Sequence, residues 1–67
     1  MKFAFQTNGH SHKYCENIVL AISALYGTSQ SESLEKINTV WHGQDFLDDD
    51  DVRYHETYDY WANTVMS

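Results

Sequence analysis

Negative charges and aromatic rings gather in one stretch near the C-terminal end of this sequence. Four consecutive aspartates, Asp48 to Asp51, are soon followed by the aromatic residues Tyr54, Tyr58, Tyr60 and Trp61. Carboxylates steer basic partners toward a surface, and rigid rings provide contact area at a low entropic cost. The pattern predicts a surface that docks a protein with a basic face. The predicted contact residues in this stretch are Asp48, Asp49, Asp50, Asp51, Tyr54 and Tyr60.

Two other interpretations of this stretch stay open. Spaced carboxylates can imitate phosphates, so the chain could be a nucleic-acid mimic that fills the groove of a nucleic-acid-binding protein. A solvated aspartate loop beside ordinary core aromatics would have the same composition. A calcium loop of the EF-hand type does not fit. A register starting at Asp48 puts Val52 at the third ligand position and Arg53 where glycine is required.

A second group of possible ligands lies near the N-terminus. His10, His12 and Cys15 are residue types that bind zinc, and Glu16 could be a fourth ligand. The spacing does not match the common zinc fingers, and no second Cys/His pair follows at the usual distance. We therefore expect a buried cysteine and polar histidines near a helix end, with no metal and no cofactor. A small zinc protein that uses His10, His12 and Cys15 is the alternative from a different functional class.

Catalysis and direct nucleic-acid binding find little support in the residues. Cys15 falls on an apolar helical stripe, whereas a nucleophilic thiolate needs an accessible, electropositive setting. The three glycines are isolated and form no phosphate-binding loop. Only four lysines and arginines are present to neutralise a phosphate backbone, although two helices joined at residues 27–29 would resemble a helix-turn-helix. We expect neither an enzyme nor a DNA-binding protein.

Charge is distributed unevenly along the chain. Residues 1–42 contain three cations and three anions, so the whole net charge of −6 comes from residues 43–67. Arg53 is the only lysine or arginine in that second part. Anionic lipid and nucleic acid would repel this half of the chain, and a basic protein surface would attract it.

Length and composition limit the class of protein. The 67 residues, 42% of them hydrophobic, suit one small folded domain over residues 1–67. A core of this size usually needs a disulfide, a metal or a second subunit, and the single cysteine excludes an internal disulfide. We expect a homodimer. The lone thiol, the absence of a signal sequence or a membrane-length apolar run, and the acidic balance favour a cytoplasmic protein that does not contact a membrane.

Hydrophobic spacing predicts a mainly α fold: a short N-terminal extended arm or strand followed by three short helices. Phe3 and Phe5 alternate in the arm, and the Asn8-Gly9 turn leads into a helix over 12–26, capped by Ser11 and ended by Gly27. We expect the arm to cross the helices or to pair with its copy in a dimer. Leu20 lies opposite the apolar stripe of this helix and is a further candidate contact with a partner.

Two more helices complete the predicted fold. Ser29 and Glu32 form a capping box for a helix that ends near Gly43, and Thr57 caps the last helix, from which Tyr60 points away. The long acidic connection over 43–56 has no clear period, and we expect Phe46 and Leu47 to fold back onto the core. The predicted core consists of Ile18, Val19, Ile22, Leu25, Leu34, Ile37, Trp41, Trp61 and Val65.

These features together predict a small acidic regulator that binds another protein. An adaptor, an inhibitor, or an immunity- or antitoxin-like protein would use such a surface to dock a basic partner. A purely structural homo-oligomer is a further possibility.

Overall fold

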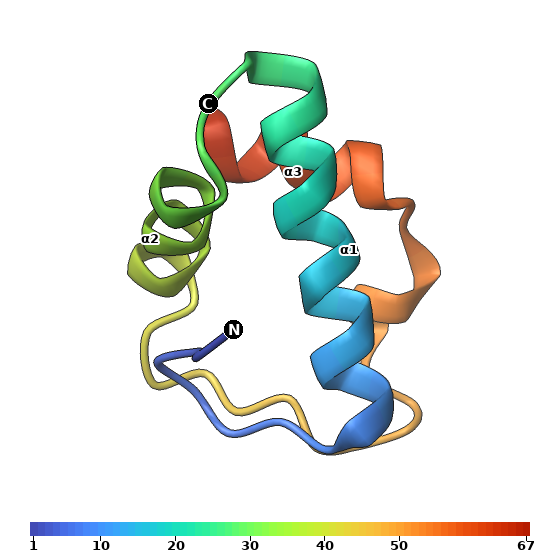
Figure 1. Cartoon of the computed structure of the whole chain (residues 1–67). Coiled ribbons are helices and arrows are strands. Elements are labelled where there is room, and N and C mark those ends of the chain that lie inside the picture. The colour runs from blue at the N-terminus through green and yellow to red at the C-terminus, as the bar shows by residue number, and fades with distance from the viewer.

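Helices account for most of the chain, and the computed structural model describes all of residues 1–67 (Figure 1). The elements are α1 (Gly9–Tyr26), α2 (Gln30–Val40), the short 3-10 helix η1 (Val52–His55) and α3 (Tyr58–Met66). The only β-type pairing is a single parallel bridge between Thr7 and Phe46. The predicted mainly α fold, with an arm, three helices and a long connection, is confirmed.

Helix α1 begins earlier than predicted, because a different residue caps it. The Asn8 side chain accepts a hydrogen bond from the Ser11 backbone N–H, and the Ser11 hydroxyl accepts one from the Asn8 N–H, both at 2.9 Å. This reciprocal box satisfies two backbone donors at the helix start. Ser11 is therefore the third helical residue, and its prediction as the N-cap is wrong.

The predicted end of the second helix at Gly43 is also wrong, because α2 stops at Val40 with Trp41 as its C-cap and Gly43 lies in the turn that follows. The remaining predicted helix ends are confirmed. Gly27 ends α1 with a φ of 68°, in the left-handed region where glycine carries no steric penalty. The Ser29 and Thr57 hydroxyls accept hydrogen bonds from the backbone N–H groups three residues later and cap α2 and α3. The helix-end residue types in this sequence thus locate most boundaries to within a few residues.

Helix α1 is central, since both α2 and α3 pack against it (Figure 1). Its buried residues Ile18, Val19 and Ile22 face Ile37 of α2 and Val65 of α3 in one core cluster. That cluster also contains Phe5, Tyr14, Cys15, Trp41, Phe46 and Ala62. The predicted core is confirmed at most positions, with Leu34 and Trp61 only partly buried.

The C-terminal turn of α1 corrects one core prediction. Leu25 is 51% exposed and Tyr26 44% exposed, although their spacing continues the buried stripe. The reason is length: α1 has 18 residues against 11 and 9 in its neighbours, and its last turn rises past α2 (Figure 1). Helical periodicity identifies a face, but only the neighbouring elements determine how much of that face is covered.

The N-terminal arm lies along residues 38–47 of the same chain. The Asn38 side chain accepts from the Ala4 N–H at 2.9 Å and donates to the Lys2 carbonyl at 3.1 Å. Further along, the Gln6 carbonyl accepts from the Phe46 N–H at 2.7 Å. The arm thus finds backbone partners within its own chain, so its pairing with a second copy is not needed to satisfy it. Homodimer formation stays a prediction.

No helix in this fold combines the length and the apolar character that a membrane crossing requires.

Candidate docking surface

The acidic connection is fixed to the rest of the fold at Phe46. This side chain is fully buried, and its carbonyl accepts a hydrogen bond from the Ser11 hydroxyl at 2.6 Å. Leu47, the next residue, is 46% exposed. Of the two residues predicted to fold back onto the core, Phe46 does so and Leu47 does not, because neighbouring side chains in an extended segment point in opposite directions.

Arg53 joins Asp51, the last residue of the aspartate run, to the segment that precedes the run. Its Nε donates to Asp51 Oδ1 at 3.0 Å and its Nη2 to Asp51 Oδ2 at 2.7 Å, a two-pronged ion pair. Nη2 also donates to the Asp45 carbonyl at 2.8 Å. The guanidinium carbon lies 3.9 Å from the centre of the Phe46 ring, and the side chain is only 11% exposed. We call this set of contacts the Arg53 clasp.

The backbone of Arg53 is held as firmly as its side chain. Its carbonyl accepts hydrogen bonds from the Tyr14 hydroxyl of α1 at 2.5 Å and from Trp61 Nε1 of α3 at 2.8 Å. The Tyr14 hydroxyl also lies 2.7 Å from the Glu56 carbonyl. Through its carbonyl, Arg53 therefore attaches the acidic connection to both α1 and α3.

Asp51 takes part in the clasp and differs in this respect from the three aspartates before it. The hydrogen bonds from Arg53 hold the pKa of Asp51 below its ordinary value of 3.8, against a smaller opposing effect of burial. Its carboxylate stays ionised and paired inside the chain. Asp51 was predicted as a partner contact, and the structure gives it an internal partner.

Five carboxylates near the clasp have no such partner. Asp48, Asp49, Asp50, Glu56 and Asp59 are exposed, and none of them forms an ion pair within the chain. We use the name acidic surface for these carboxylates together with the exposed rings of Tyr58 and Tyr60, which lie on different sides of α3. In Figure 1 the segment from residue 48 to the start of α3 runs along one side of the molecule, beside α1.

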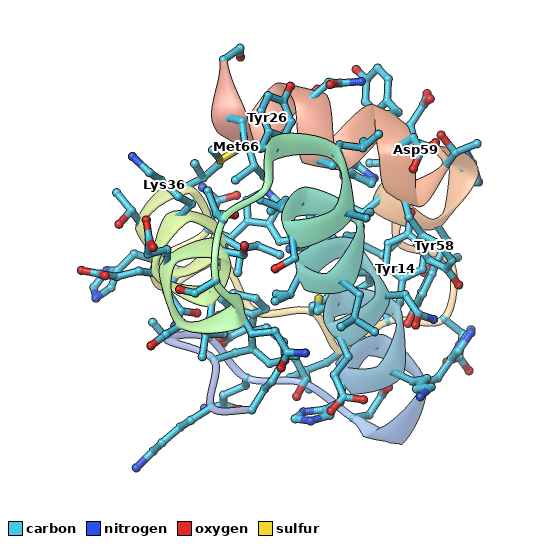
Figure 2. The ribbon with its side chains drawn as sticks, turned by 45° about the horizontal axis from the view of Figure 1, so that its top comes forward. Tyr14, Tyr26, Lys36, Tyr58, Asp59 and Met66 are labelled. Atoms are coloured by element: carbon cyan, nitrogen blue, oxygen red, sulfur yellow. The ribbon has the colours of Figure 1, made fainter.

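The two rings of the acidic surface are held in place by neighbouring aromatic residues. Tyr58 is 40% exposed, packs 5.1 Å from the Tyr14 ring, and accepts a hydrogen bond from Asn17 Nδ2 at 3.2 Å. Tyr60 is 47% exposed and packs edge-on against Trp61 at 5.0 Å. In Figure 2 Tyr58 lies beside Tyr14, with Asp59 close by on α3. Each ring is therefore packed on one side and exposed to solvent on another.

Tyr54, which was predicted as a contact residue, is partly buried and packs against the core. Its ring packs against Tyr14 and Phe46 at 5.0 and 4.7 Å, and its buried hydroxyl has no hydrogen-bond partner. Leu20, the other predicted contact outside the aspartates, is 43% exposed on α1.

Sequence reasoning missed Glu56 and Asp59 as members of the acidic surface. Both carboxylates lie close to Tyr58 and Tyr60 in the sequence, and this proximity was a usable signal.

The three candidate zinc ligands do not form a site. Cys15 is completely buried, and burial raises the pKa of its thiol to about 12. His12 pairs with Glu16 at 3.4 Å, and His10 stacks on the Tyr54 ring at 4.6 Å. No group of three or more His, Cys, Asp or Glu side chains lies close enough together to hold a metal ion.

The surface has one open depression, of about 220 Å³, lined by Glu32, Glu35, Lys36 and Thr39. These four residues lie on a single face of α2 and include no hydrophobic side chain. A ligand pocket is usually concave and largely apolar, so this depression is an ordinary helix surface.

No family model, curated protein sequence or solved structure matches this chain. Its function is therefore inferred from its own geometry and charge.

Proposed function

We propose that this chain is a small acidic regulator that binds a protein with a basic surface through the acidic surface. An adaptor, an inhibitor, or an immunity- or antitoxin-like protein would act in this way. The observation that carries the proposal is the five exposed and unpaired carboxylates beside the one local cation, Arg53, whose charge Asp51 already neutralises.

The charge of this surface supports fast and selective encounter. Uncompensated carboxylates create a local negative potential that speeds the approach of a basic protein and disfavours acidic ones. The effect extends over roughly 8 Å at physiological ionic strength, so it acts mainly near contact. Nucleic acids and anionic lipids would be repelled by the same potential.

The rings of Tyr58 and Tyr60 supply the short-range part of the interaction. Tyrosine is enriched at binding hot spots because it combines a large contact area with few rotatable bonds and a polar hydroxyl. Both rings are already packed on one side. An arginine or lysine of the partner that reached either ring could make a cation–π contact in addition to ion pairs with neighbouring carboxylates.

The test is a comparison of two triple variants of equal net charge. D48N/D49N/D50N neutralises the acidic surface, and E16Q/E32Q/E35Q neutralises three carboxylates on α1 and α2. Partner proteins captured from the native host are purified, and their affinity for each variant is measured at low and physiological salt, with the fold checked by circular dichroism. We expect the first variant to lose about tenfold or more in affinity and most of its salt dependence, and the second to bind almost normally.

Equal losses in both variants would mean that net charge alone matters, and no loss in the first would reject the acidic surface. Duplex DNA is included as a competitor in the same assay. If DNA displaces the chain from the same groove of its partner, the carboxylates act as phosphate mimics, which was the alternative interpretation of the aspartate run.

A further inference from the structure

We propose that Arg53 is the residue that positions the acidic surface for docking, and that lysine cannot replace it. This inference rests on the docking function proposed above. It adds that the aspartate loop is closed and shaped before a partner arrives, by a cation that the chain itself supplies.

The contacts of the guanidinium close a loop. Nη2 donates to the carbonyl of Asp45 before the aspartate run, and Nε and Nη2 donate to Asp51 at its end. Nη1 donates to the Gln44 carbonyl at 3.4 Å, which adds a second contact with the segment before the aspartate run. Asp48, Asp49 and Asp50 therefore form the tip of a loop whose two ends are bound to one side chain.

A closed loop opposes the tendency of three neighbouring carboxylates to move apart. Like charges repel one another, and a free run of aspartates would sample many extended conformations. A partner that bound such a run would have to order it, and this loss of conformational freedom weakens binding. The clasp imposes that order within the free protein. The surface can then present its charges without a further ordering cost.

The chemistry of the clasp requires arginine. The planar guanidinium donates to both carboxylate oxygens of Asp51 and to a backbone carbonyl while its face covers the Phe46 ring at 3.9 Å. A lysine ammonium is a single point charge with no flat face and no two-pronged geometry. Arg53→Lys therefore keeps the net charge of the protein but opens the loop.

The experiment separates charge from shape by comparing R53K with the wild type. Amide hydrogen exchange is measured over residues 47–51, and binding kinetics are measured with an octa-arginine peptide as the basic probe. We expect exchange in the loop to become about tenfold faster. The peptide should dissociate about three- to tenfold faster while its association rate changes less than about twofold, because the net charge is the same.

If circular dichroism shows that R53K does not fold, D51N replaces it in the experiment. E35Q on α2 is then the control, because it removes the same amount of charge. Faster exchange with an unchanged dissociation rate would overturn the positioning role, and so would unchanged exchange. A wild-type protein that shows no salt-sensitive binding to the peptide would instead reject the docking function itself, which distinguishes the two failures.

Discussion

The ring centres of Tyr14 and Tyr54 lie 5.0 Å apart, but only one of the two hydroxyl groups has hydrogen-bond partners. The Tyr14 hydroxyl faces the carbonyls of Arg53 and Glu56 and joins α1 to the segment before α3. The Tyr54 hydroxyl is buried without any partner. Burying a polar group without a hydrogen bond costs free energy, whereas a satisfied one is nearly neutral or favourable.

This contrast predicts opposite effects of the same chemical change. Tyr14→Phe should lower the free energy of unfolding by about 1–2 kcal/mol, because the hydroxyl proton shared by the Arg53 and Glu56 carbonyls is lost and only the Arg53 carbonyl keeps another side-chain donor, Trp61 Nε1. Tyr54→Phe should leave it unchanged within about 0.5 kcal/mol or raise it, because only an unpaired hydroxyl is removed. Urea denaturation of both variants against the wild type provides the measurement. A larger loss for Tyr54→Phe than for Tyr14→Phe would contradict the hydrogen-bonding pattern described above.

Residue types near the acidic run predicted a docking surface, but they did not separate the exposed side chains from those that pack or pair inside the chain. Asp48 and Asp51 are chemically identical, and only the position of Arg53 makes the second an internal partner. Tyr54 and Tyr60 are likewise the same residue type, one partly buried against the core and one exposed. Local sequence carries no information about which side of an irregular segment faces the core, because no fixed period relates its side chains.

At the scale of elements, the N-terminal arm depends on one side chain of α2. Asn38 offers both an acceptor and a donor to the arm backbone, as a paired strand would. We predict that Asn38→Ala releases the arm, so that the Ala4 amide exchanges with solvent about ten times faster. Asn38→Asp keeps the acceptor for the Ala4 N–H and loses only the donor to Lys2, so its effect should be smaller.

Alanine is a better helix former than asparagine, so Asn38→Ala regains part of the free energy of unfolding that it loses with the two hydrogen bonds. Amide exchange at Ala4 is the suitable measurement because it reports on the arm itself. Thr39→Ala, one residue further along α2, is the matched control, since the Thr39 hydroxyl donates within its own helix to the Glu35 carbonyl. If Thr39→Ala accelerated exchange at Ala4 as much as Asn38→Ala does, a general loosening of α2 would explain the result.

The helices themselves followed from sequence more closely than the segments between them. Capping residues and glycine stops act through the backbone of their own turn, so their effect is largely independent of the rest of the fold. The choice of Asn8 over Ser11 as the first cap was missed because both types suit that position, and the reciprocal box uses both. The path of the arm was open for the opposite reason, because its partners lie more than thirty residues away.

At the scale of the whole molecule, burial of ionisable groups makes stability depend on alkaline pH. Burial raises the pKa of Cys15 from 9.0 to about 12 and raises those of Tyr14 and Tyr54 above 10.0. The folded state therefore holds these protons more tightly than the unfolded chain does. Their contribution to stability is complete below pH 9 and is lost as the pH rises through the folded-state values.

We predict that the urea midpoint falls steadily as the pH rises from about 9 toward about 12. Cys15→Ala removes the thiol contribution, so its midpoint should be lower at neutral pH but should fall less over the first part of this range. The native thiol should also react with a soluble disulfide reagent only under conditions that unfold the protein. A rapid reaction at neutral pH in the folded state would contradict the burial of Cys15.

Sequence patterns alone predicted the helical class, the caps of α2 and α3, most of the core on α1 and the placement of the negative charge in residues 43–67. These properties depend on near neighbours in the chain, on hydrophobic periodicity or on composition. Only the tertiary structure decided which aspartates are free, which tyrosines are exposed and how the arm is held. Each of these depends on contacts across long sequence separations, above all those of Arg53 with Asp45, Tyr14 and Trp61.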